Sequence, residues 1–419
     1  MTCLRMTRLS PVFCMNAPQI NAAYQNIGES LVRELAKLMG QSGMISLAGG
    51  YPGPELFDRE GILDASREAL TDAPTACLQY GPTDGLFLLR EQIALWMQSR
   101  GIPCDPADVL VTSGSQQGFD LVNRALLRPG QAAVVERPTY TGPLRALKVA
   151  GVQILTVGGD AQGLDVDELE DLLRDPSQPR PTLMYVVPTF ANPTGATMSL
   201  ERRLKLLHLA AEHHFVIIED DPYGDLRFSG AAVPHLLTLL DQVPEARPWL
   251  VHLGSFSKVL APGLRVSWLI APPPIRNACL LVKQLDDLSN PGLTQMTVAR
   301  YLAAGRLEQH LPVFLNAYRE RATAMQSAIE RHLSPQMAFN PVEGGMFMWG
   351  RLADDFNSRD LLALAIEEKV TFVAGDIYYG NQADTRTLRL SFSTPSPSQI
   401  EEGVARIGRA LTRLSRQRR

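Results

Sequence analysis

The stretch DVLVTSGSQQGFDLVNRALLRPG, residues 108–130, contains a complete strand, turn and helix. Its first five residues are apolar almost throughout, as in a strand that is buried on both faces. The small residues SGS at 113–115 then form a turn, and apolar residues recur at helical spacing until Pro129 and Gly130 end the pattern. A buried strand followed by a helix is the repeating unit of an α/β sheet.

The same alternation of apolar runs and helical patterns extends from about residue 85 to about residue 290. Further strands are expected at Ala132–Glu136, Val152–Val157, Leu183–Val187, Phe215–Glu219, Leu250–Leu253 and Arg265–Ile270. Between two of them, Leu200–His214 has the pattern of an amphipathic helix. Apolar strands separated by helices are typical of a mostly parallel sheet covered on both faces. We therefore predict an α/β fold whose ligands bind beyond the carboxyl ends of the strands.

The pattern changes after about residue 310. A long helical pattern at 311–332 precedes GGMFMW at 344–349, another helix and a strand at 387–392. This α+β texture predicts a second, smaller domain. The expected division is a disordered extension at 1–25, with Met6 and Met15 as alternative starts, an N-terminal arm of the small domain at 26–60, a large domain at 61–310 and the small domain at 311–419.

Composition excludes several classes of protein. Apolar residues make up 45% and charged residues 20% of the 419, which excludes intrinsic disorder. A net charge of −4 argues against binding to nucleic acid or lipid by bulk charge, and no apolar run approaches the roughly 20 residues of a membrane span. The five cysteines show no CxxC or Cys/His spacing, so we expect reduced thiols, a cytoplasmic location and no metal.

Lys258 follows an apolar strand in GSFSK at 254–258. Desolvation lowers the pKa of a lysine and makes its amine nucleophilic, as Schiff-base chemistry requires. A solvated loop lysine is the simpler explanation of any single lysine, so the hypothesis depends on the surrounding residues.

Asp220 ends the strand FVIIED, where its carboxylate can pair with a pyridinium nitrogen. A metal site is an alternative because Glu219 and Asp221 are adjacent. However, successive residues of a strand point to opposite faces, and no partner histidine is evident in the sequence. A helix cap or turn carboxylate before Pro222 is a further alternative.

The run SGSQQG at 113–118 joins a strand to a helix, and its amides with the helix dipole suit a phosphate. The hydroxyls of Ser115, Ser255 and Ser257 and the guanidinium of Arg265 would complete such a site. A turn that only caps the helix is the structural alternative.

Three more polar or aromatic residues lie where a cofactor ring is expected. Asn192, in the turn NPTG, is able to hydrogen-bond a phenolic oxygen. Tyr140 and Tyr223 follow strands, so one can stack on a ring while the other donates to its oxygen. Either tyrosine is equally compatible with a core or interface position.

From about residue 28 to residue 393, the chain resembles the class I, fold type I, pyridoxal-phosphate aminotransferases. The motifs that carry the resemblance are ISLAGGYPGPELF at 45–57, LQYGPTDGLFLLRE at 78–91, VTSGSQQGFDL at 111–121, RPTYTG at 137–142, ANPTG at 191–195, IIEDDPYGDL at 217–226, GSFSKVLAPGLRVSW at 254–268 and LRLSFS at 388–393. Eight motifs in the same order as in the family make the resemblance specific. The chain is most similar to the 2-aminoadipate, aromatic and kynurenine aminotransferase branch.

The resemblance implies a role for each matching residue. Lys258 would hold pyridoxal phosphate as a Schiff base and shuttle the proton between the α carbon and C4′. Asp220 would bind the ring nitrogen, Asn192 and Tyr223 the phenolic oxygen, and Tyr140 would stack on the ring. The phosphate would lie among Ser115, Gln116, Ser255, Ser257 and Arg265, with Tyr80 reaching it from the other subunit of a homodimer.

The same resemblance implies a substrate site. Arg389, in an apolar strand-like run, would bind the α-carboxylate, because a planar guanidinium suits a planar carboxylate. Its alternative is a structural salt bridge. Gly50 and Tyr51 would lie beside the substrate, and Tyr51 stands where relatives often carry an aliphatic residue. Arg33 would approach a distal carboxylate, although a solvated helix face explains it equally well.

The leading hypothesis is an aminotransferase that moves the α-amino group of a hydrophobic, aromatic or 2-aminoadipate-like amino acid to a 2-oxo acid such as 2-oxoglutarate, by a ping-pong mechanism. A pyridoxal-phosphate lyase or decarboxylase on the same fold is the alternative. A third hypothesis is the effector-sensing domain of a transcriptional regulator. About 30 residues precede the LVREL segment, too few for the DNA-binding domain of such regulators.

Overall fold

A seven-stranded sheet forms the centre of the computed structural model, which describes residues 18, 20–25, 31–38, 41–353 and 356–417. In spatial order its strands are β2 (Val109–Thr112), β10 (Ser267–Ile270), β9 (Leu250–Ser255), β8 (Val216–Asp221), β7 (Pro181–Val186), β3 (Ala132–Glu136) and β4 (Gln153–Val157). All seven were predicted, with ends that differ by no more than two residues. Only β10 runs antiparallel to its neighbours, which confirms the mostly parallel α/β sheet.

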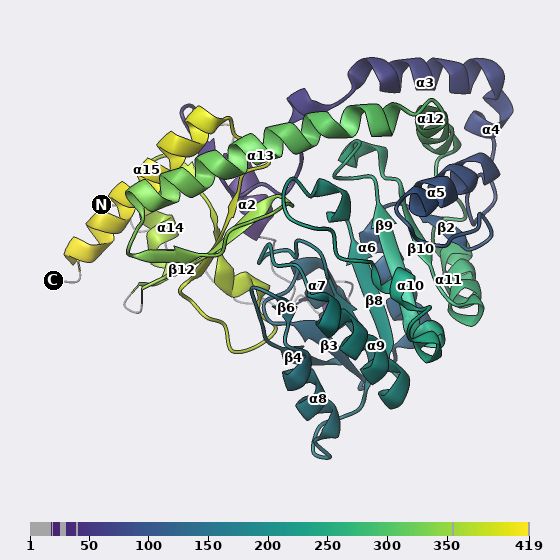
Figure 1. Cartoon of the computed structure of the whole chain (residues 1–419), viewed down its shortest axis with the longest axis horizontal. Helices are drawn as coiled ribbons and strands as arrows, with labels where there is room; N and C mark the ends of the chain where they lie inside the picture. The colour runs from purple at the N-terminus through teal and green to yellow at the C-terminus, as the bar shows by residue number, and fades with distance from the viewer. Residues whose placement is uncertain (1–17, 19, 26–30, 39–40, 354–355, 418–419) are drawn as a thin grey trace.

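Helices cover both faces of this sheet (Figure 1). The covering helices are α6 (Ser115–Leu126) and α7 (Thr141–Ala150) on one face, and α8 (Val166–Arg174), α9 (Leu200–His213) and α10 (Leu236–Leu239) on the other. Along β8, Ile218 packs in the hydrophobic cluster of α6 and α7, whereas Ile217 packs in that of α8 and α9. Because side chains alternate along a strand, Asp220 faces the α6 side, and Glu219 and Asp221 face the α9 side.

A second, smaller sheet lies in the C-terminal part of the chain. Its order is β11 (Met337–Phe339), β12 (Phe347–Leu352), β15 (Thr387–Ser391) and β14 (Val373–Ala374), with every neighbouring pair antiparallel. Nearby helices are α13 (Arg306–His332), α14 (Ser358–Glu367) and α15 (Pro397–Gln417). Figure 1 shows α13 running from the side of α12 to the part that holds β12 and α15. The N-terminal arm joins this part, because β1 (Ile45–Ser46) pairs in parallel with β13 (Val370–Thr371).

The remaining elements are short or connect these layers. They are α1 (Ala22–Gln25), α2 (Leu31–Leu38), α3 (Arg59–Asp72), α4 (Pro74–Leu78), α5 (Phe87–Ser99), α11 (Pro273–Asp286), α12 (Gly292–Ala303), the hairpin β5 (Gly159–Asp160) with β6 (Gly163–Leu164), and the 3-10 helices η1 (Pro54–Leu56), η2 (Gly224–Leu226), η3 (Pro244–Trp249), η4 (Pro262–Leu264) and η5 (Gly375–Tyr378). The domain boundaries stay predictions: residue 310 falls inside α13, and most of the expected extension lies outside the described residues. No helix of the described ranges combines the length and apolarity needed to cross a membrane.

Candidate active site

Most of the predicted site residues meet in one cavity of about 370 Å³, although they come from separate strands and loops. Those lining it are Gly50, Tyr51, Ser115, Gln116, Tyr140, Asn192, Asp220, Tyr223, Ser255, Ser257, Lys258, Arg265 and Arg389. Several follow parallel strands directly, so the cavity lies where an α/β sheet is expected to bind a ligand.

Lys258 lies inside this cavity, three residues after the end of β9. Its Nζ donates a hydrogen bond to the carbonyl oxygen of Gly50 at 2.9 Å. Burial, together with the positive charges of Arg265 and Arg389, lowers the pKa of Lys258 to about 8. A lowered pKa favours the nucleophilic form of the amine. The hydrogen bond of Lys258 to Gly50 inside the cavity argues against the alternative of a solvated loop lysine.

Asp220 has one carboxylate oxygen that accepts a hydrogen bond and one that has no hydrogen-bond partner among the described residues. The hydroxyl of Tyr185 donates to Oδ2 at 2.6 Å, whereas Oδ1 is buried and has no hydrogen-bond partner among the described residues. Burial raises the pKa of Asp220 to about 6, and the Tyr185 hydrogen bond opposes this effect. A buried acceptor without a partner is costly, so Oδ1 is suited to a donor that a bound molecule supplies.

An anion-binding cradle lies at the start of α6. Gly114 precedes the helix at φ 113° and gives it no side-chain cap. The guanidinium of Arg265 reaches this turn and donates to the carbonyl oxygen of Ser113 at 2.7 Å. A Cβ atom at Gly114 would lie 2.1 Å from Arg265 Nη2, so glycine is required there for the close approach. The start of α6 and the Arg265 guanidinium border the same cavity, and helix amides together with a guanidinium suit a phosphate.

Serine hydroxyls border the same cradle. Ser267 Oγ donates to Ser255 Oγ at 2.7 Å, and Ser255 Oγ donates to Ser257 Oγ at 3.0 Å. Ser267 is not among the predicted residues. The chain of hydroxyls fixes Ser255 and Ser257 at the wall of the cavity.

Arg389, on β15, crosses from the small sheet to the NPTG turn. Its Nη1 donates to Asn192 Oδ1 at 2.8 Å and its Nη2 to the carbonyl oxygen of Ala48 at 2.7 Å. The guanidinium carbon lies 4.1 Å from the centre of the Phe347 ring. Within the described part of the chain, Arg389 pairs with no carboxylate and its buried Nε has no partner. The alternative of a structural salt bridge is therefore wrong.

Among the residues not found from the sequence are Tyr185 and Tyr378, which line the cavity, and Phe347, which packs against Arg389. Tyr378 lies 5.3 Å from the Arg389 guanidinium carbon, and its buried hydroxyl has no partner among the described residues. For Tyr185 a signal exists, because a tyrosine in a strand buried on both faces needs a hydrogen-bond acceptor. Phe347 and Tyr378 come close to Arg389 only when the chain is folded, and no pattern in the sequence indicates these contacts.

Glu219 and Asp221 do have histidine partners, contrary to the sequence analysis. His252 Nδ1 lies 2.9 Å from Glu219 Oε2, and His235 Nδ1 lies 3.3 Å from Asp221 Oδ2. Both histidines are distant in the sequence. The alternation along β8 places Asp220 on the other face, so the three acids do not converge on one point.

Of the predicted site residues, one lies apart from the cavity, and another has a side chain that the structure does not describe. Tyr80 is 83% exposed and does not line the cavity of its own chain. Arg33 falls in α2, but its side chain lies outside what the structure describes.

The family model for aminotransferase class I and II matches residues 42–407. The chain belongs to this family. A 2-aminoadipate transaminase of Thermus thermophilus is 39% identical over 93% of this chain and 95% of its own. Aromatic-amino-acid aminotransferase 1 of Thermococcus litoralis is 37% identical over 91% of each chain.

Solved structures agree with the family. The α-aminoadipate aminotransferase LysN of Thermus thermophilus, complexed with N-(5′-phosphopyridoxyl)-L-leucine, matches with a TM-score of 0.87 and 38% identity over 95% of this chain and 98% of that chain. These findings confirm the fold type, the aminotransferase class and pyridoxal phosphate as the cofactor of this enzyme.

The cavity fits this cofactor on its own geometry. Asp220 Oδ1 offers the free acceptor that a protonated ring nitrogen requires, and the cradle at α6 offers the site for a phosphate. Lys258 lies in the same cavity.

Proposed function

We propose that this aminotransferase accepts hydrophobic, aromatic or 2-aminoadipate-like amino acids and passes their amino group to a 2-oxo acid such as 2-oxoglutarate by a ping-pong mechanism. The observation that carries the proposal is Arg389, a buried guanidinium that faces the Lys258 cavity without a carboxylate partner in the described chain. A substrate carboxylate would supply that partner, and would hold the α carbon near the Lys258 amine.

Each residue then has a definite task. Bound pyridoxal phosphate supplies an electron sink for the α carbon. Lys258, with its pKa lowered to about 8, would move the proton between the substrate's α carbon and C4′ of the cofactor. Asp220 would keep the proton on the ring nitrogen, and Tyr140 would stack on the ring. The phosphate would be held by Ser115, Gln116, Ser255, Ser257 and Arg265, all of which line the cavity.

Asn192 and Tyr223 hold the phenolic oxygen of the cofactor. Because Asn192 Oδ1 already accepts from Arg389, its amide nitrogen is directed away from Arg389 and is available as a donor. The Arg389 contact therefore selects the orientation of Asn192 that the cofactor needs.

The charges of the cavity favour an uncharged donor side chain. The cationic residues that line it are Lys258, Arg265 and Arg389, and each has a task toward cofactor or α-carboxylate. Tyr51 and Tyr378 add aromatic surface. A 2-aminoadipate-like donor needs a further cation for its distal carboxylate, and Arg33 is our candidate. The names of the relatives support both donor classes.

We also propose a cytoplasmic homodimer with shared active sites. The exposed Tyr80 is available to a second subunit, whose phosphate site it would complete. The described cysteines Cys77, Cys104 and Cys279 are buried and free, as expected in a reducing compartment.

The test is a visible absorption spectrum of the purified enzyme with pyridoxal phosphate, before and after each of a panel of amino acids. We expect the yellow band to be replaced by that of pyridoxamine phosphate with hydrophobic or aromatic donors, and to return with 2-oxoglutarate. Bleaching only by 2-aminoadipate or glutamate would exclude the uncharged donors. Release of carbon dioxide or of a cleaved side chain, without a stable pyridoxamine form, would favour the lyase alternative.

A further inference from the structure

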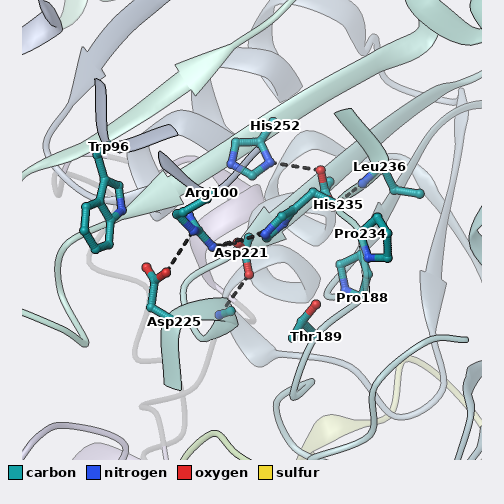
Figure 2. Close-up of polar contacts among 12 residues, drawn as sticks. Trp96, Arg100, Pro188, Thr189, Asp221, Asp225, Pro234, His235, Leu236 and His252 are labelled. Carbon is teal, nitrogen blue, oxygen red and sulfur yellow. Dashed lines mark hydrogen bonds and ion pairs between the residues drawn. The ribbon is translucent and has the colours of Figure 1, made fainter. Parts of the chain in front are cut away.

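Asp220 lies near the end of β8 and Tyr223 lies between β8 and η2, and Arg100 contacts this stretch on either side of Tyr223. Arg100 directly follows α5. Its Nη2 lies 2.9 Å from Asp221 Oδ2, and its Nε lies 2.8 Å from Asp225 Oδ1. Figure 2 shows the guanidinium between the two carboxylates. One side chain thus joins residues two positions before and two positions after Tyr223.

This clamp is buried and further braced. Arg100 is 12% exposed, and Asp221 is 1% exposed. Asp221 Oδ1 also accepts from the amide of Gly224 at 3.0 Å, which closes the turn that contains Tyr223. His235 lies against both charges, with Nε2 3.2 Å from Arg100 Nη2 (Figure 2). Buried charges that are fully paired resist displacement, because breaking one pair leaves an uncompensated charge.

Arg100 itself does not line the cavity. It contacts the face of β8 opposite to Asp220, which lies in the site. Its influence on the cofactor must therefore pass through the segment 221–225. A guanidinium is suited to this, since its nitrogens bind two carboxylates in different directions, whereas a lysine ammonium is a single point of charge.

We propose that Arg100 is a positioning residue for the cofactor site: by holding Asp221 and Asp225 together, it sets the hydroxyl of Tyr223 against the phenolic oxygen of pyridoxal phosphate. The inference rests on the proposed role of Tyr223. Asp221 and Asp225 are the arms of this clamp, and Arg100 is its centre.

The test is a pH titration of the visible bands of the holoenzyme, which gives the pKa of the Lys258–cofactor linkage. A hydrogen bond from Tyr223 stabilises the deprotonated linkage, so weakening it raises this pKa. Tyr223→Phe removes the hydroxyl altogether, so the rise of the linkage pKa in this variant is the largest that a misplaced Tyr223 can cause. We expect Arg100→Lys to raise the linkage pKa by about 0.5–1, because a hydrogen bond worth roughly 1 kcal/mol corresponds to a change of that size.

Asp225→Asn separates positioning from a direct charge effect. Removing a negative charge near the site by itself lowers the linkage pKa, whereas a misplaced Tyr223 raises it. We expect a rise. The variant should fold, because burial already raises the pKa of Asp225 to about 6 and the fold thus tolerates its neutral form. Arg100→Lys keeps the charge, so a purely Coulombic role predicts no change for that variant and a fall for Asp225→Asn.

Combining each variant with Tyr223→Phe completes the test. If Arg100 acts through Tyr223, Arg100→Lys does not shift the linkage pKa further in the Tyr223→Phe background, and Asp225→Asn shows there only the fall that its lost charge causes. Arg202→Gln is the matched control: Arg202 is ion-paired to Asp160 and touches the β5–β6 hairpin, not the segment 221–225. It should leave the linkage pKa unchanged. A wild-type linkage pKa in Arg100→Lys and Asp225→Asn overturns the proposal, whereas a wild-type value in Tyr223→Phe overturns the role of Tyr223 on which it rests.

Discussion

Arg389 and Asn192, 197 positions apart in the chain, share a hydrogen bond of 2.8 Å between Nη1 and Oδ1. This contact links β15 of the small sheet to the NPTG turn, which follows β7 of the large sheet. In the proposed function it also couples two tasks, because Arg389, proposed to bind the substrate carboxylate, orients Asn192, proposed to contact the cofactor.

Asn192→Ala should therefore impair both substrate and cofactor binding. Loss of a hydrogen bond to a charged group is worth about 1.5–3 kcal/mol, so we expect kcat/KM for the amino donor to fall about 10- to 100-fold. Asn192→Asp should raise KM more than Asn192→Ala, because its carboxylate would compete with the substrate for Arg389. Steady-state kinetics decide this. The control is Asn357→Ala, which removes the cap of α14 and should leave KM unchanged.

Arg389→Lys tests carboxylate recognition directly. The lysine keeps the charge but loses the planar pair of donors, so kcat/KM for amino acids should fall about 100-fold. The amine that corresponds to each donor without its α-carboxylate should lose far less. Equal losses for the amino acid and the amine would contradict the role of Arg389.

Asp220→Asn should stabilise the enzyme without cofactor while abolishing transamination. In the fold, burial raises the pKa of Asp220 to about 6 from its ordinary 3.8. A raised pKa means that stability present below the ordinary value is lost as pH rises through the folded value, by about 2–3 kcal/mol at neutral pH. Thermal unfolding of apoprotein should show a higher Tm for the variant at pH 7.5 and a similar Tm near pH 4. Added pyridoxal phosphate should stabilise the wild type more than the variant.

The sheet and most of the site were predictable because their signals are local. Each strand is a mostly apolar run, and parallel strands bring their carboxyl ends to one edge, so Lys258, Asp220 and Ser115 were expected to converge. Arg100 was missed because its partners lie more than a hundred positions away and nothing near it in the sequence indicates burial. Tyr80 and Arg33 remain predictions, since one requires a second subunit and the other falls outside the described side chains.

Glu136, at the end of β3, should make the stability of the fold decrease as pH rises. It is buried, and Oε2 accepts from the amide of Val187, a residue of the cavity wall, at 3.0 Å. Burial raises the pKa of Glu136 to about 8, and this one hydrogen bond only partly opposes it. Stability that is present below the ordinary pKa of 4.5 is therefore lost as pH rises toward 8.

Glu136→Gln should remove this loss, because its amide oxygen still accepts from Val187 and carries no charge at any pH. At pH 5 the two proteins should differ little. At pH 8 the shift of the pKa corresponds to about 4 kcal/mol, and the variant should be more stable by this amount less the cost of burying the amide. The measurement is the Tm of both apoproteins from pH 5 to 9, with the exposed Glu212→Gln as control. Parallel curves for wild type and Glu136→Gln would mean that Glu136 is ionised in the fold with a partner that offsets its burial.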